Sequence, residues 1–67
     1  MIVSAGKWEA DNRLKRFKIE HDPQAGFYLY VFDGEKCVAD YLQDTLELAM
    51  LQAEQDFGVP PSSWRKI

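Results

Sequence analysis

Residue types that support redox chemistry or metal binding are scarce in this sequence, which has one cysteine and one histidine among 67 residues. Cys37 has no second cysteine for an internal disulfide, and with His21 it does not provide the ligand spacing of a zinc site. The sequence therefore predicts no metal and no other cofactor. The aromatic residues near Cys37 predict a buried and unreactive thiol, and a lone cysteine favours a reducing, cytoplasmic location.

Long apolar runs are also lacking. No segment approaches the roughly 18 consecutive apolar residues of a membrane-spanning helix. The N-terminal apolar stretch ends at Lys7, which is too early for the hydrophobic region of a signal peptide. We therefore expect a soluble protein with no membrane partner.

Side chains that could act as nucleophiles, acids or bases do not form a catalytic set. His21 and Asp22 are adjacent, and on a strand their side chains would point to opposite faces. Ser62 and Ser63 follow two prolines, which is typical of a turn. No glycine-rich phosphate loop and no HExxH motif is present. The sequence thus predicts a protein that is not an enzyme.

The composition, 46% hydrophobic and 28% charged, is that of one small globular domain covering residues 1–67. A domain of this size buries only about 60% of the surface of its unfolded chain, so each large apolar residue matters. The patterns divide the chain into an N-terminal segment, a sheet, a helix and a tail. These cover residues 1–12, 13–42, 44–57 and 58–67.

Three segments of the predicted sheet have strand patterns. Residues 13–21 alternate apolar and charged side chains, and residues 27–32 are aromatic, aliphatic or β-branched throughout. Residues 37–42 follow Asp33-Gly34, a strong hairpin signal. The expected fold is α+β: a three-stranded antiparallel meander in the order β-β-β-α, with a C-terminal amphipathic helix packed on one face.

The hairpin loops decide which residues share a face. A loop of two or four residues at Asp33-Gly34 would group Phe27, Leu29, Val31, Val38, Asp40 and Leu42. The other face would then hold Tyr28, Tyr30, Phe32, Cys37, Ala39 and Tyr41. We expect the helix on the aliphatic face, where few hydroxyl groups need partners. An odd loop over residues 22–26, with Gly26 as a bulge, would add Phe17 and Ile19 to that face, and we adopt this register.

Residues 44–61 contain the start and stop signals of one helix. Asp44 and Glu47 have the spacing of a capping box, Gly58 suits a left-handed C-terminal residue, and Pro60-Pro61 prevent continuation. At about 100° per residue, one stripe collects Leu46, Ala49, Met50, Ala53 and Phe57.

Leu48 and Leu51 point away from this stripe, and they would be exposed unless the tail with Trp64 covers them. One helix cannot cover two sheet faces that are both rich in large side chains. We therefore predict an interaction surface, and a homodimer that uses it. Its candidate residues are Tyr28, Tyr30, Phe32, Tyr41, Leu48, Leu51 and Trp64.

The aromatic face also has the residues of a stacking platform for single-stranded nucleic acid, with Arg16 and Lys18 on the neighbouring strand. The charge distribution disfavours this alternative. The net charge is −3, and residues 19–59 contain nine acidic residues and one basic residue, which weakens attraction to phosphate. Nucleic acid is therefore not the expected partner.

Residues 26–64 resemble a segment of short uncharacterised bacterial proteins, most specifically in the pattern DTLE…AE…FGVPP…W. A looser similarity is to HicB-like antitoxin domains. Gly26-Phe27-Tyr28 and Thr45-Leu46-Glu47 match a strand that begins Gly-Phe-Tyr and a helix that opens Thr-Leu-Glu-Glu-Ala, while Leu48 replaces the second Glu. That resemblance implies strands followed by a helix, oligomerisation, and an antitoxin-like or toxin-neutralising role.

The sequence as a whole predicts a small non-enzymatic protein–protein interaction module that self-associates. An antitoxin-like role and single-stranded nucleic-acid binding are the alternatives.

Overall fold

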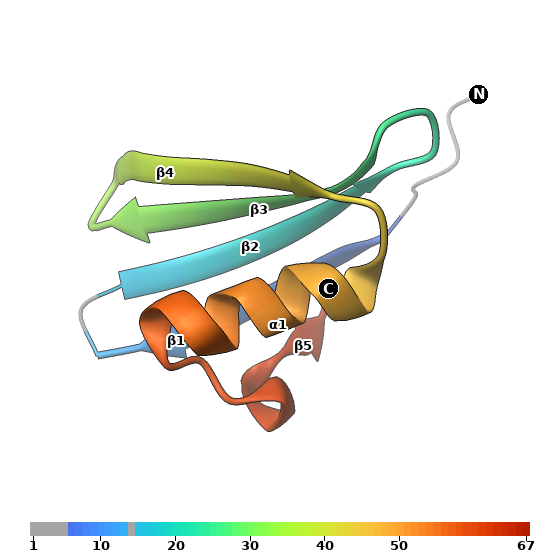
Figure 1. Ribbon diagram of the computed structural model, residues 1–67. Helices are drawn as coiled ribbons and strands as arrows, with labels where there is room; N and C mark the ends of the chain where they lie inside the picture. The colour runs from blue at the N-terminus through green and yellow to red at the C-terminus, as the bar shows by residue number, and fades with distance from the viewer. Residues whose placement is uncertain (1–5, 14) are drawn as a thin grey trace.

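The computed structural model describes residues 6–13 and 15–67. One antiparallel sheet has the strand order β4-β3-β2-β1-β5, and helix α1 lies on one of its faces (Figure 1). The strands are β1 Lys7–Asn12, β2 Lys15–Asp22, β3 Gly26–Asp33, β4 Lys36–Gln43 and β5 Arg65–Lys66. Helix α1 spans Leu46–Phe57, and the short 3-10 helix η1 spans Pro61–Ser63.

The α+β class, with an antiparallel sheet and one α-helix, is confirmed, but the three-stranded meander is wrong. The three predicted strands correspond to β2, β3 and β4. The segment 1–12, predicted to lie outside the sheet, contains β1, which pairs with β2 from Lys7↔Glu20 to Asn12↔Lys15. The tail contributes β5, which pairs with β1. A two-residue strand is too short for a period-two pattern, so its pairing depends on tertiary contacts alone.

The β2–β3 hairpin has a loop of three residues, because Asp22 pairs with Gly26. This odd number places Phe17 and Ile19 on the helix face, as predicted. Gly26 pairs within the ladder rather than forming a bulge, and its φ is +128°. A Cβ atom there would collide with the carbonyl oxygen of Gln43, so this position requires glycine.

The faces predicted for the residues of β4 that follow Cys37 are wrong. Phe32 pairs with Cys37 but Val31 pairs with Ala39, so a bulge leaves Val38 as an extra residue. One inserted residue moves every later side chain of the strand to the other face. The side chains brought to the helix face in this way are Ala39 and Tyr41, and those removed from it are Asp40 and Leu42.

The predicted burial of Cys37 is also wrong, because the thiol is exposed. Cys37 lies one residue before the bulge, on β4, which is an edge strand of the sheet that the described residues form.

The core lies between α1 and the covered face of the sheet. Its fully buried side chains are Ala10, Phe17, Ile19, Leu29, Val31, Ala49, Ala53 and Val59. The predicted helix stripe is confirmed, because Ala49 and Ala53 are buried and Leu46, Met50 and Phe57 pack against the same cluster.

The two ends of α1 differ in how well the sequence predicts them. The capping box at Asp44 is wrong, because Thr45 is the N-cap and its Oγ1 accepts a hydrogen bond of 3.1 Å from the Leu48 amide. The C-terminal signal is confirmed. Gly58 has φ +72°, and its N–H donates to the Glu54 carbonyl at 3.0 Å.

Candidate functional site

The sheet face opposite α1 carries a row of aromatic side chains on strand β3. The rings of Tyr28 and Tyr30 are stacked with centroids 5.9 Å apart, and the centroids of Tyr30 and Phe32 are 6.5 Å apart. Leu42, the cross-strand partner of Tyr28, is 50% exposed. We call Tyr28, Tyr30, Phe32 and Leu42 the apolar strip. We call the sheet face opposite α1 the open face. The apolar strip occupies the part of it formed by β3 and β4.

The part of the same face formed by β1, β2 and β5 carries charged side chains, and we call it the charged half. Arg16 Nε lies 3.4 Å from Asp11 Oδ1, and Arg65 lies 3.6 Å from carboxylate oxygens of both Glu9 and Asp11. These pairs are exposed, so each contributes little to stability. They do compensate much of the positive charge beside the apolar strip.

The hydroxyl group of Tyr30 stays neutral on this face. Burial, with a smaller effect from the negative charge of Glu20, raises the pKa of the Tyr30 phenol above its ordinary value. The apolar strip therefore presents a protonated hydroxyl group, which can donate a hydrogen bond without adding charge.

The structure brings together only part of the predicted interaction surface. Tyr28, Tyr30 and Phe32 share the open face, but the expectation that Tyr41 joins them is wrong. Tyr41 lies on the helix face, where its ring centroid is 6.4 Å from that of Phe57. The cause is the bulge in β4, which changes the direction of Tyr41.

Leu48 and Leu51 lie on the solvent side of α1, with exposed fractions of 42% and 43%. The tail does not pack over them. Instead it turns through η1 and runs back to β1, where Arg65 pairs with Glu9 (Figure 1). Leu48 and Leu51 thus form a second exposed apolar surface, on the side of the molecule away from the apolar strip.

Trp64 packs against the core as a half-buried side chain. Its indole Nε1 is buried and has no hydrogen-bond partner in the part of the chain that the structure describes. This position lets Trp64 anchor the tail to the core, and it separates Trp64 from the apolar strip.

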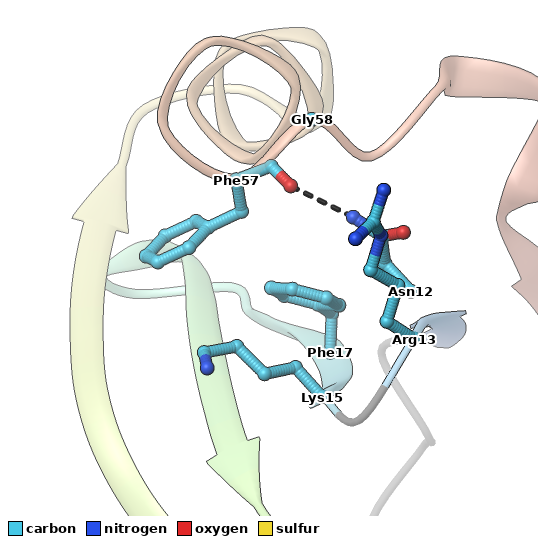
Figure 2. Close-up of a pocket in the computed structure, with 6 residues that line it drawn as sticks. All are labelled: Asn12, Arg13, Lys15, Phe17, Phe57 and Gly58. Atoms are coloured by element: carbon cyan, nitrogen blue, oxygen red, sulfur yellow. Dashed lines mark hydrogen bonds between the residues drawn. The ribbon is translucent and has the colours of Figure 1, made fainter.

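A cleft of about 590 Å³ lies where the β1–β2 turn meets the C-terminal end of α1 (Figure 2). Its lining consists of Asn12, Arg13, Lys15, Phe17, Phe57 and Gly58. This cleft cannot be predicted from the sequence, because the pattern of residues 1–12 does not predict a strand. Its position depends on β1 bringing the turn beside the helix end.

Metal and membrane sites have no candidates among residues 6–13 and 15–67. No three His, Cys, Asp or Glu side chains gather there to hold a metal ion. No helix in these ranges combines the length and apolarity needed to cross a bilayer.

Comparisons of the chain with protein-family models, curated proteins and solved structures gave no match. The resemblances to short bacterial proteins and to HicB-like antitoxin domains therefore stay predictions. The apolar strip and the cleft are the features from which a function can be inferred.

Proposed function

We propose that this protein is a small non-enzymatic interaction module that self-associates through the open face of its sheet. The observation that carries this proposal is the apolar strip, in which three adjacent large aromatic side chains and the half-exposed Leu42 occupy a sheet face that no helix of the described residues covers. Contiguous exposed apolar surface is typical of interfaces, and Tyr and Phe are enriched in interface cores.

A second copy of the chain fits this face. In a two-fold dimer the apolar strip meets the same strip of the partner, so apolar surface is buried against apolar surface. Two sheets packed face to face lie about 10 Å apart, which leaves room for one interdigitated layer of side chains. The charged half, with Arg16 and Arg65 already paired to carboxylates, would form the polar rim.

The outer leucines of α1 are not part of this contact. Helix α1 lies on the opposite face of the sheet, so a two-fold contact through the apolar strip leaves Leu48 and Leu51 outside it (Figure 1). The open face is preferred because its aromatic side chains provide a larger and more rigid contact area than the two leucines.

Protein is favoured over single-stranded nucleic acid as the partner. Arg16 and Arg65 on the open face are paired with carboxylates, and the net charge of the chain is −3. Tyr30 has Lys18 as its cross-strand partner on β2 and Asp40 on β4, so the basic neighbour of the stacking surface is offset by an acidic one. Phosphate attraction, the main source of affinity for nucleic acid, is therefore weak here.

Sedimentation equilibrium over a concentration series tests this proposal. We expect a mass rising from 7.8 kDa toward twice that value. Leu42→Lys should abolish the dimer, whereas Leu51→Lys, the same change at a similarly exposed leucine on α1, should leave it intact. Raising the salt concentration should not weaken the dimer, because apolar burial drives it.

A monomer at every concentration, or equal loss of the dimer in both leucine variants, would contradict self-association through this face. Tight binding of a single-stranded oligonucleotide that falls steeply with salt would favour the nucleic-acid alternative instead.

A further inference from the structure

We propose that the cleft between the β1–β2 turn and the end of α1 binds a carboxylate carried on an apolar body. This proposal is independent of self-association, because the cleft lies on the helix side of the sheet. Arg13 comes from the turn, and Asn12 and Lys15 are the strand residues that flank it. Phe57 and Gly58 come from the helix end (Figure 2).

The floor of the cleft is aromatic. The rings of Phe17 and Phe57 lie 5.5 Å apart between centroids and are tilted by 51°. A volume of about 590 Å³ falls in the range of small-molecule sites, which combine apolar walls with a few polar groups. In the view of Figure 2, Lys15 extends below the two rings, and Asn12 and Arg13 stand on the other side of Phe17 from Phe57. The apolar part of a ligand would contact the half-buried ring of Phe57, because Phe17 behind the lining is fully buried.

The two cations of the cleft, Arg13 and Lys15, form no ion pair with any residue in the described ranges. Asp33 is the cross-strand partner of Lys15. Asp11 and Glu35 line a neighbouring pocket together with the two cations. The nearby carboxylate of Asp11 is occupied by Arg16 and Arg65. Cations beside an apolar floor favour an anionic group on the ligand, and a guanidinium binds a carboxylate through two parallel hydrogen bonds.

Arg13 has an unfavourable backbone conformation for its residue type. Its φ is +58°, and it is the one non-glycine residue with positive φ among those described. Glycine or asparagine would adopt this turn conformation with less strain. Strained residues concentrate at functional sites, and here the strain accompanies a guanidinium held at the edge of the cleft.

The end of α1 limits how much negative charge the cleft accepts. The helix C-terminus carries partial negative charge, and Glu54 and Asp56 lie in its last turn. Asn12 Nδ2 already donates to the Phe57 carbonyl at 2.8 Å, so that amide is not available to the ligand. A single carboxylate at the Arg13 guanidinium therefore fits better than a doubly charged phosphate. The Lys15 ammonium, on the other side of Phe17, adds attraction over a longer distance (Figure 2).

Titration of the 15N-labelled protein with 3-phenylpropanoate tests the proposal. We expect saturable shifts of the Gly58 amide and of the Asn12 side-chain amide. The neutral 3-phenylpropanamide should bind about tenfold more weakly, and inorganic phosphate should give no saturable shift. A peptide ending in phenylalanine, with a free or an amidated terminus, shows whether a chain terminus or only a free acid enters the cleft.

Two variants separate ligand binding from folding. Arg13→Gly should weaken 3-phenylpropanoate binding about tenfold while keeping the thermal midpoint, because glycine adopts the turn conformation readily. Lys15→Gln should weaken binding to a smaller extent, because its ammonium group lies on the other side of Phe17 from Arg13. Lys18→Gln is the matched control, since it removes the same charge from the other face of β2. The affinity of this variant for 3-phenylpropanoate should equal that of the unchanged protein.

Shifts that stay linear in ligand concentration would overturn the proposal. So would equal affinities for the acid and the amide, or equal losses in Lys15→Gln and Lys18→Gln.

Discussion

The side-chain amide of Asn12 donates a hydrogen bond of 2.8 Å to the carbonyl oxygen of Phe57 and thereby joins the last residue of β1 to the last residue of α1. The last carbonyl groups of a helix have no partner within the helix. Asn12 satisfies one of them, and it also holds the β1–β2 turn beside the cleft (Figure 2).

Asn12→Ala should therefore lower the free energy of unfolding by about 1 kcal/mol, because it removes one half-buried hydrogen bond. Urea denaturation measures this change. Gln24→Ala, at an exposed position in the β2–β3 loop, is the control and should have little effect. Equal midpoints for Asn12→Ala and the unchanged protein would show that the bond is absent in solution.

Replacement of Arg13 tests the strain in the β1–β2 turn. Arg13→Gly should keep or raise the thermal midpoint, since strain of about 1 kcal/mol is relieved and offsets the greater flexibility of glycine in the unfolded chain. Arg13→Val should lower the midpoint, because a β-branched side chain tolerates positive φ poorly. The same midpoint for both variants would be inconsistent with φ +58° at this residue.

Substitutions at the N-terminus of α1 test whether Thr45 or Asp44 caps the helix. Thr45→Ala should lower the free energy of unfolding by about 0.5–2 kcal/mol, because it removes the bond from Oγ1 to the Leu48 amide. Asp44→Ala should have a smaller effect. Chemical denaturation of both variants measures the difference, and a larger loss for Asp44→Ala would favour the capping box predicted from the sequence.

Trp64 should anchor the C-terminal tail. Trp64→Ala should lower the free energy of unfolding by about 2 kcal/mol or more, because a large half-buried ring is lost from the core. Trp64→Phe should lower it much less, since it keeps an aromatic ring and removes the buried indole N–H that has no partner among the described residues. Thermal denaturation compares the three proteins, and wild-type stability of Trp64→Ala would show that the tail is not anchored.

The stability of the protein should fall in alkaline solution partly because of Tyr30. Its pKa is raised in the folded state, so the unfolded chain releases the phenolic proton at lower pH. The stabilising contribution of the neutral phenol is present below the ordinary pKa of 10.0 and is lost as the pH rises through the folded-state pKa. Tyr30→Phe should show a shallower decline than the unchanged protein in denaturation measured across this range. Identical declines would contradict the shift.

The sequence by itself determined the elements whose signals are local. The helix stripe and the end of the helix at Gly58 depend on residues within a few positions of one another, and both are confirmed. The aromatic strand β3 and the register that places Phe17 and Ile19 on the helix face could also be predicted. Periodicity, turn chemistry and capping act over short stretches of chain, so they are visible without the fold.

Only the tertiary structure decided the features that depend on contacts between distant segments. Strand β5 is two residues long and forms because the tail reaches β1. The bulge at Val38 turned Tyr41 toward α1 and Leu42 toward the open face, although no residue pattern in β4 marks it. The cleft exists because Asn12 and Phe57 meet, which requires β1 to pair with β2 beneath the helix end. Such pairings are selected by the packing of the whole core, and a period of two residues cannot encode them.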